Sequence, residues 1–425
     1  MSGSDEESVW QARRQRALIA LAGAARFMTG ILMGTVMAVY VGRVGSEFAV
    51  SMVLTAYYVG VMFFAPVWGA IADVTGRRRA VMVGTGAIAT LAVLPLTVVS
   101  GPWAQIGLRA LYAVFAIGFV PVMLTVVSAR GGESGRGRSL GFFNSARAAG
   151  FTGGQVVAGV LLGLLVPADL YLFIAGTSLV STVAAVFVHD PTPTPDRKPT
   201  LDELLAEIRR RLLPTADERA HLRTNGLRWL YVGLALRNMT VMGVMSLAPP
   251  FLLDSVGVTE FVMGIVLALN PASQSVFMLL FGRLADHVGR KPLVVGGMAG
   301  SGVFAVVAGA SALPAAGTTR ILVAVAAWVL IGAAFSAMTT GALAFIGDVA
   351  PADRQSELMG LRSTAKGVGG VVGPPIMGAI ATGSSIGTAF LVGSLLAFAA
   401  AMLVAAALVE SRPGGAPADA VAVDD

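Results

Sequence analysis

Six basic side chains fall within long apolar stretches of this 425-residue sequence, where a charge is costly. A charged side chain near the centre of a bilayer costs about 2.5–3.5 kcal/mol, so it normally faces a cavity or a partner. The acidic residues nearest to these stretches, such as Asp73 and Asp286, all fall at their ends. Arginine offers forked donors to a carboxylate or a phosphate, so a cavity lined by these residues suits an anion. The six are Arg26, Arg109, Arg147, Arg237, Arg362 and Lys366.

Five of these six residues are candidate substrate contacts, because Arg362 lies near enough to the end of its stretch to reach the surface. Arg147 and Lys366 could instead bond helix-end carbonyls or Asp residues. Uncharged polar residues could line the same cavity, or equally satisfy hydrogen bonds between helices. These candidates are Tyr57, Tyr112, Asn144, Asn270 and Gln274.

Membrane-spanning helices are the elements that must position these residues. Hydrophobic residues make up 56% of the chain and charged residues 13%, about half of the charged fraction of a soluble domain. A helix that crosses the hydrocarbon core needs about 20 apolar residues, and an open sheet would leave backbone groups unbonded in lipid. The twelve predicted spans are 15–42, 48–71, 80–100, 103–128, 139–165, 169–188, 229–253, 259–281, 292–313, 320–347, 357–381 and 385–409.

Basic residues gather on one side of these spans. An even number of spans places both termini on one side, which also carries residues such as Arg13, Arg136 and Arg290, whereas the other side has Arg43 and Arg320. The excess of basic residues in short loops marks the cytoplasmic side. We therefore predict a multi-pass protein of the cytoplasmic membrane with both termini in the cytoplasm, and the strong preference for Arg over Lys suggests a prokaryote.

A polar linker divides the chain into two halves of six spans each. Its segment LDELLAEIRRRLL, from Leu201, predicts an amphipathic helix with acids first and arginines last, the order that the helix dipole favours. This helix could lie on the membrane surface or bind a regulatory partner. The predicted organisation is a tail at 1–14, a six-helix half at 15–190, the linker at 191–228, a second six-helix half at 229–410 and a tail at 411–425.

The two halves repeat each other in sequence. The segment RFMT at Arg26 recurs as RNMT at Arg237, and GFFNSAR at Gly141 is echoed by GLRSTAK at Gly360. The pairs keep their order along the chain, which indicates duplication. Parallel repeats place a binding site between the halves near the membrane midplane.

A spaced glycine and aspartate motif stands after the second span of each half. Residues 69–78 read GAIADVTGRR, and residues 282–291 read GRLADHVGRK. This pattern resembles the signature loop of the major facilitator superfamily, although Val74 stands where the family often has a basic residue. The resemblance covers the whole chain and implies an all-α fold of twelve transmembrane helices in two pseudo-symmetric halves. It also implies a latch that holds the cytoplasmic side shut, made by Gly69, Asp73, Gly76, Arg77, Gly282, Asp286, Gly289 and Arg290; anchoring by the basic residues alone is the alternative.

Glycines on the fifth and eleventh spans resemble a second family pattern, the antiporter motif G-x-x-x-G-P-x-x-G-G. Gly150, Gly154 and Gly159 match it, but Gln155 replaces the proline and Ala158 a glycine. The eleventh span keeps Gly373 and Pro374. In the family this motif is typical of drug or metabolite efflux, while close helix packing explains the same glycines equally well.

The resemblance also offers an alternative role for Arg109. It stands where the family often has an arginine on the fourth span, for which a proton-relay role is proposed. Tyr112 and Ala113 replace the Gln and Gly of the usual pattern.

The resemblance implies secondary active transport of a small organic solute by alternating access, with proton-coupled efflux as the leading expectation. An organic-anion symporter, exchanger or facilitator with a clamp of Arg26 and Arg237 is the alternative, and a non-transporting membrane sensor is another. No ATP-binding motif is present, which argues against an ATP-driven pump, and the three histidines lack metal-ligand spacing. We expect a transporter rather than an enzyme, without a cofactor or a metal. The expected partners are the lipid bilayer, a small-molecule substrate and protons, without nucleic acid, and the chain is expected to be a monomer.

Overall fold

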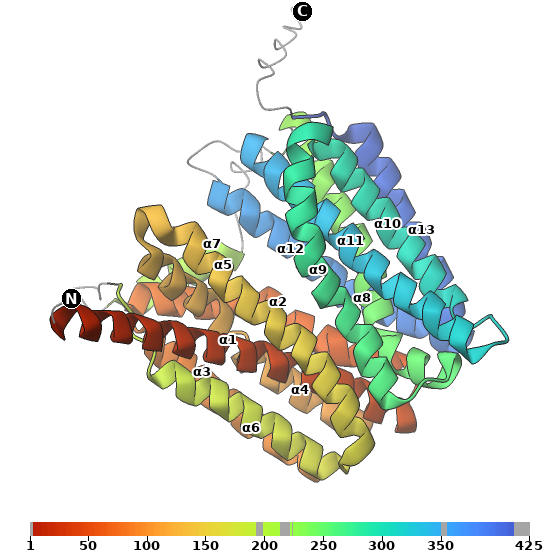
Figure 1. Ribbon diagram of the computed structural model, residues 1–425, viewed down its shortest axis with the longest axis horizontal. Helices are drawn as coiled ribbons and strands as arrows, with labels where there is room; N and C mark the ends of the chain where they lie inside the picture. The colour runs from red at the N-terminus through yellow and green to blue at the C-terminus, as the bar shows by residue number, and fades with distance from the viewer. Residues whose placement is uncertain (1–2, 193–198, 213–221, 223, 350–354, 412–425) are drawn as a thin grey trace, which may run out of the picture.

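The computed structural model is built from helices, and its described residues contain no strand (Figure 1). The structure describes residues 3–192, 199–212, 222, 224–349 and 355–411. The predicted tail beyond Ser411 lies outside these residues, as do parts of the linker. Within the helices, the side chains at 3–9, 133–134, 286 and 355–357 are likewise not described.

The first half contains six helices. Span 4 consists of α4 and the beginning of α5, with a break at Ile117 and Gly118. Gly132, with φ 59° and ψ −170°, then interrupts α5, and the segment after it is span 5. The helices are α1 (Gly3–Val44), α2 (Glu47–Thr75), α3 (Arg78–Val93, followed by a 3-10 turn at Leu94–Thr97), α4 (Pro102–Ala116), α5 (Phe119–Leu164) and α6 (Pro167–Val186).

The second half repeats this arrangement after the linker helix. The predicted amphipathic helix is present as α7, and a π-helical turn at Phe251–Val256 extends the first helix of the second half. Serine and threonine side chains cap several helices; Ser385, for example, accepts a hydrogen bond from the Thr388 backbone N–H at 3.1 Å. The helices are α7 (Leu201–Leu212), α8 (Leu227–Pro250), α9 (Glu260–Val288), α10 (Arg290–Ala310), α11 (Gly317–Val349), α12 (Gln355–Gly383) and α13 (Ile386–Ala407).

Ten helical segments of the described chain are long and apolar enough to cross a membrane. The two predicted spans outside that group are the part of α5 after Gly132 and helix α12. Both carry charged residues and glycines, and both contact the opposite half, because α5 packs against α9 and α12 against α2. Their lower hydropathy reflects a position between the halves rather than against lipid.

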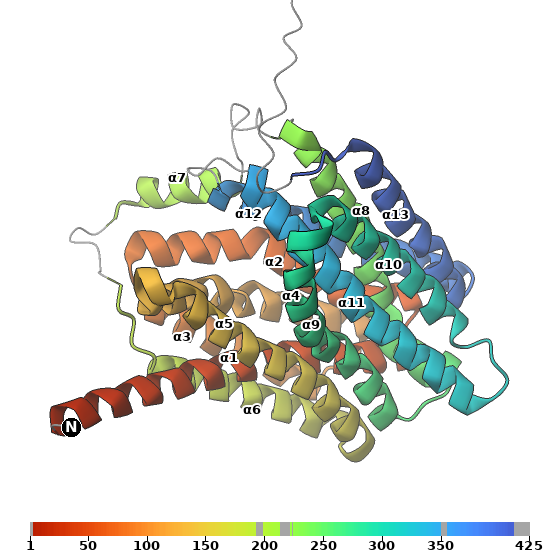
Figure 2. The same cartoon turned by 45° about the horizontal axis from the view of Figure 1, so that its top comes forward.

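The two halves share an apolar core at one end and separate at the other (Figures 1 and 2). We call the end where α1 begins and α7 lies the linker side, and the opposite end the far side. Near the far side, one core joins residues of both halves, such as Leu32 and Val53 with Leu247 and Met263. Toward the linker side each half has its own core. The described structure is therefore closed on the far side.

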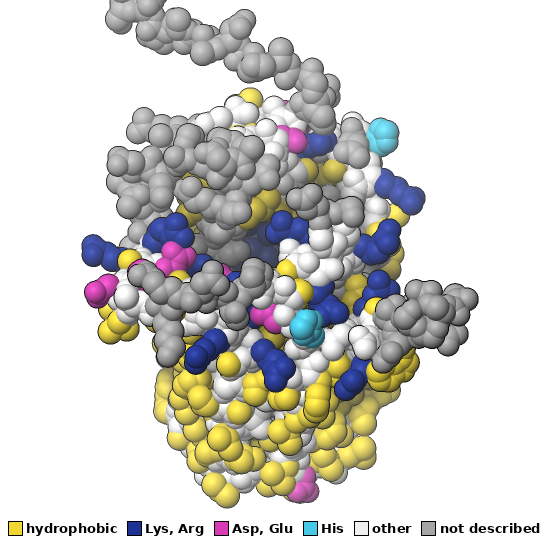
Figure 3. Space-filling view, turned by 90° about the vertical axis from the view of Figure 1, so that its left-hand side faces the viewer, with side chains coloured by type: hydrophobic (Ala, Val, Ile, Leu, Met, Phe, Trp, Pro, Cys, Tyr) yellow, Lys and Arg dark blue, Asp and Glu magenta, His cyan; other side chains and the backbone are white. Residues whose placement is uncertain are grey.

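The surface shows the same division. Viewed from the side where α1 begins, basic side chains gather above a broad hydrophobic surface (Figure 3). Exposed leucines and valines cover the helices that face outward, as expected for contact with lipid tails. Arg13, Arg77 and Arg79 are exposed at the linker side, where their charges can remain solvated.

Glycines make the far-side closure possible. A Cβ atom added at Gly159 of α5 would lie 2.6 Å from the Glu260 carbonyl oxygen and 2.9 Å from the Gly264 Cα atom of α9. At Gly378 of α12, an added Cβ would lie 2.9 Å from the Phe48 Cα atom of α2. Small residues allow such close backbone contact, which drives helix association in lipid.

Gly159→Leu is predicted to open the far side, because overpacking costs about 1–3 kcal/mol and would shift the population about fivefold or more. The chain has no cysteine, so spin labels on Val166→Cys and Leu313→Cys would report the distance between the far ends of the halves without background labelling. The distribution should shift to longer distances.

Gly163→Leu is the matched control on the same helix, since a Cβ atom there would meet nothing within 4 Å. It should leave the distances unchanged. A Gly159→Leu protein with the parental distances would show that the glycine contact does not close the far side.

Candidate functional site

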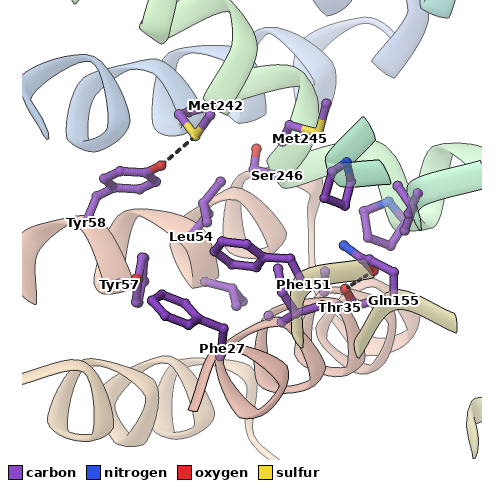
Figure 4. Close-up of a pocket in the computed structure, with 18 of the residues that line it drawn as sticks. Phe27, Thr35, Leu54, Tyr57, Tyr58, Phe151, Gln155, Met242, Met245 and Ser246 are labelled. Carbon is purple, nitrogen blue, oxygen red and sulfur yellow. Dashed lines mark hydrogen bonds between the residues drawn. The ribbon is translucent and has the colours of Figure 1, made fainter. Parts of the chain in front are cut away.

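A cavity of about 330 Å³ lies between the two halves (Figure 4). Helices α1, α2, α4 and α5 line it from the first half, and α8 and α9 line it from the second. Cavities of this size are typical of small-molecule sites, which combine apolar walls with a few polar groups. Of the ten substrate-contact candidates in the sequence, six line this cavity: Arg26, Tyr57, Arg109, Tyr112, Asn270 and Gln274.

Helix α1 contributes a groove to the wall. Arg26, Gly30, Gly34 and Ala38 all line the cavity and stand four residues apart, so they share one face of the helix. A Cβ atom added at Gly30 would meet nothing within 4 Å. The open space beside Arg26 therefore exists because these positions lack side chains. A search of the sequence for polar residues alone does not find such positions.

Two arginines of the first half gather around one tyrosine. The guanidinium carbons of Arg26 and Arg109 each lie 5.3 Å from the ring centre of Tyr112, and that of Arg109 lies 5.2 Å from the ring of Tyr57. These are cation–π distances. Arg109 is 2% exposed, Arg26 8% and Tyr112 not at all.

The opposite wall is more apolar, and a hydrogen bond across the cavity joins it to the first half. The Tyr58 hydroxyl of α2 donates to the Met242 sulfur of α8 at 2.8 Å (Figure 4). Within the first half, the Thr35 hydroxyl donates to the Gln155 side-chain oxygen at 2.9 Å. Met245, Ser246, Pro249, Leu267, Asn270, Pro271 and Gln274 complete the second-half wall.

Arg237 does not line the cavity with Arg26. Its Nε donates to the Ser301 hydroxyl at 2.8 Å, and its guanidinium lies over the Phe335 ring, so it lies inside the second half. The related position in the repeat therefore does not produce the expected clamp in this conformation. The rotation of α8 about its own axis sets the direction in which Arg237 points, and this rotation cannot be read from the sequence repeat.

Arg147, Lys366 and Asn144 lie outside the cavity lining as well. Arg147 is exposed and lies 5.6 Å from the ring centre of Phe27, a residue that lines the cavity. Lys366 is partly buried over Phe335, and Asn144 is exposed. The two basic residues stand on the linker side of the cavity.

The glycines of the antiporter-like pattern pack against neighbouring helices. Gly150 and Gly154 of α5 contact the α1 backbone, and Gly373 of α12 contacts the α8 backbone at Met239. Pro374 follows Gly373 within α12. The described contacts of this pattern thus belong to helix packing, and Gly159 adds the contact between halves.

The first signature loop pairs with the linker helix. Asp73 accepts hydrogen bonds from Arg78 at 3.2 Å and from Arg211 of α7 at 3.1 Å, while Arg77 is exposed. Gly69 leaves room for this pair, because a Cβ atom there would lie 2.9 Å from the Arg211 Nη1 atom. Gly76, with φ 65°, ends α2 in a left-handed conformation that favours glycine.

The second signature loop pairs within its own half. Arg290 donates from Nε to Asp348 at 3.0 Å, and its backbone N–H donates to Glu410 at 2.8 Å. Gly289 takes the left-handed φ of 96°, and a Cβ atom added at Gly282 would meet nothing within 4 Å. The Asp286 side chain lies outside the description. Sequence reasoning missed the partners Arg211, Asp348 and Glu410, which stand far along the chain.

Charged hydrogen bonds also order α7 itself. Arg210 and Arg211 donate to Glu207 at 2.6 and 2.7 Å. These bonds hold the pKa of the Glu207 carboxyl below its usual range, and the bond from Arg210 has the largest effect. The carboxylate therefore persists at neutral pH, and its stabilising effect is lost only as the pH falls through that lowered pKa.

The fold and the cavity between two repeated halves define a membrane transporter. The chain belongs to the Major Facilitator Superfamily, whose family profile matches residues 17–257 and 230–422. This membership confirms the predicted fold class and the expectation of a transporter rather than an enzyme.

Relatives in bacteria support the same assignment. The "Multi-drug resistance efflux pump PmrA" of Streptococcus pneumoniae serotype 4 is 27% identical over 371 residues, which cover 84% of this chain and 87% of that protein. The "Uncharacterized MFS-type transporter YuxJ" of Bacillus subtilis is 23% identical over 82% of this chain and 87% of its own.

Solved structures share the fold at low identity. The nucleoside transporter NupG superposes with a TM-score of 0.71 at 14% identity, over 92% of this chain and 98% of that one. An auto-inhibited POT family peptide transporter superposes with a TM-score of 0.73 at 16% identity, over 94% of this chain and 99% of that one.

Arg211→Gln is predicted to loosen α7, because it removes the bonds to both Asp73 and Glu207. Amide hydrogen exchange across residues 201–212 should accelerate about fivefold, as expected for loss of about 1 kcal/mol from partly exposed ion pairs. Arg209→Gln, an exposed position of the same helix, is the control and should exchange as the parent does. Equal exchange in all three proteins would contradict a docked α7.

Proposed function

We propose that this protein exports a small organic solute across the cytoplasmic membrane by alternating access, driven by proton antiport. The observation that carries the proposal is the cavity of about 330 Å³ between the two repeated halves, above a far side closed by their shared core. A transporter exposes such a site to each side in turn.

The orientation follows from the basic side chains of the linker side, which the positive-inside rule assigns to the cytoplasm. The described conformation is then closed toward the outside. A solute from the cytoplasm would reach the cavity past Arg147 and Lys366 and leave after the far-side glycine contacts separate. The relative named as a multidrug efflux pump supports export as the direction.

Gly30→Leu is predicted to abolish transport while the protein still folds, because the new side chain would fill the α1 groove where a Cβ atom meets nothing within 4 Å. Steric exclusion worth about 1.4 kcal/mol already weakens binding about tenfold. Transport of solutes that stabilise the parent against heat, measured in proteoliposomes, is the assay.

Gly84→Leu is the control for this substitution. Gly84 is exposed on α3, and a Cβ atom there also meets nothing within 4 Å. It should transport at the parental rate. Parental transport by Gly30→Leu would contradict the assignment of the cavity as the substrate site.

Proton coupling predicts that an imposed pH gradient drives accumulation. In inverted vesicles, solute should accumulate several-fold when the interior is acidic, since protons then leave as solute enters. Collapse of the gradient with nigericin should abolish accumulation but leave equilibration intact. Accumulation that is indifferent to the gradient would exclude antiport and leave facilitated diffusion.

A further inference from the structure

The cavity wall of the first half carries two buried positive charges without an acidic partner. The described residues that line the cavity include Arg26 and Arg109 but no aspartate or glutamate. Within the described part of the chain, neither arginine forms an ion pair. This is an unusual arrangement, because buried charges are normally paired.

Several polar atoms at this wall are also left without partners. The Nε and Nη1 atoms of Arg109 and the hydroxyl of Tyr112 are buried and find no hydrogen-bond partner among the described residues. Buried polar groups that lack partners are rare and indicate a missing ligand, ion or water. Here all three atoms belong to side chains that line one cavity.

Apolar side chains form much of the remaining lining, which also includes polar residues such as Gln155, Asn270 and Gln274. Phe27, Phe151, Met242 and Met245 line it together with the Tyr57 ring, and Figure 4 shows these side chains around the open space. Methionine and aromatic side chains adapt to flat apolar groups. Charge and apolar surface therefore meet in a single cavity.

The approach from the linker side is basic as well. The Lys366 ammonium of α12 and the Arg237 guanidinium lie 5.0 and 5.7 Å from the ring centre of Phe335, and the Arg147 guanidinium lies 5.6 Å from that of Phe27. Clefts with one sign of charge and low-dielectric walls concentrate ions of the opposite sign. An anion would be attracted along this path, and a cation would be repelled.

We propose that Arg26 and Arg109, together with the Tyr112 hydroxyl, bind the anionic group of an organic anion whose apolar body lies against Phe27, Phe151, Met242 and Met245. This proposal rests on the proposed transport function and adds the class of substrate. The residues that would bind the anionic group all belong to the first half, since Arg237 lies inside the second half.

A matched set of probes tests the charge requirement. Naphthalene-2-sulfonate, naphthalene-2-sulfonamide and 2-naphthylmethylammonium carry the same ring system with a negative, neutral and positive group. Binding to the purified full-length protein in lipid nanodiscs should favour the sulfonate over the sulfonamide by about tenfold or more, as expected for about 1.5–3 kcal/mol from bonds to a charged group.

Arg109→Gln and Arg26→Gln should each remove most of the preference for sulfonate and leave the affinity for sulfonamide within about twofold. Arg43→Gln, at the far end of α1, is the control and should keep the preference. The melting temperature without ligand should not fall in Arg109→Gln, because an unpaired buried charge is removed. A merely structural arginine would lower that temperature and change the affinities for both probes equally.

Arg109→Lys provides the second variant, since it keeps the charge and should retain part of the preference. Equal affinity for sulfonate and sulfonamide, preference for the ammonium probe, or an undiminished preference in both Gln variants would overturn the anion site. Transport of the neutral or cationic probe in those cases would leave the proposed function standing. Binding of sulfonate without transport of any probe would instead contradict the function and keep the site.

Discussion

The close contact of backbones at the far side is the constraint on which the rest of the structure depends. Gly159 and Gly264 bring α5 and α9 together, and Gly378 brings α12 to α2. Lipid tails are as apolar as the helices, so association depends on such packing rather than on the hydrophobic effect. With the far ends joined and the linker ends apart, a cavity necessarily lies between the halves.

This closure also explains why the cavity can hold unpaired charge. Arg26 and Arg109 line the cavity between the halves, so their side chains lie at its wall instead of against lipid. Their contacts with Tyr57 and Tyr112 keep them in place without neutralising them. A buried charge that is held but not paired favours a ligand of the opposite sign, because the ligand offsets part of the cost of burial.

The linker helix α7 forms an ion pair with the aspartate of the first signature loop. Asp73 pairs with Arg211 in the described conformation, and Gly69 provides the space for that side chain. In the second loop, Arg290 pairs with Asp348 inside the second half, whereas its counterpart Arg77 in the first loop is exposed. The two signature loops are thus alike in sequence but have different partners. The family motif therefore identifies the charged groups that can form ion pairs. The conformation of the protein determines which of these groups pair.

The sequence by itself determined the class of fold and the inventory of charges, and only the tertiary structure decided which arginines meet. Span length, loop charge and the repeat of Arg26 at Arg237 can be read from the sequence, because each is a pattern of residues along the chain. These patterns located six of the ten candidate contacts in the cavity. The glycines at 30 and 34 could have been noticed, because they stand four and eight residues after Arg26 on the same helix face.

A helix that is apolar on most sides has no strong periodic pattern, so hydropathy gives its length but not its rotation. Packing against neighbours sets that rotation. It turns Arg26 and Arg109 toward the same tyrosine and Arg237 toward Ser301, and so moves the expected pair of arginines from across the halves into the first half alone.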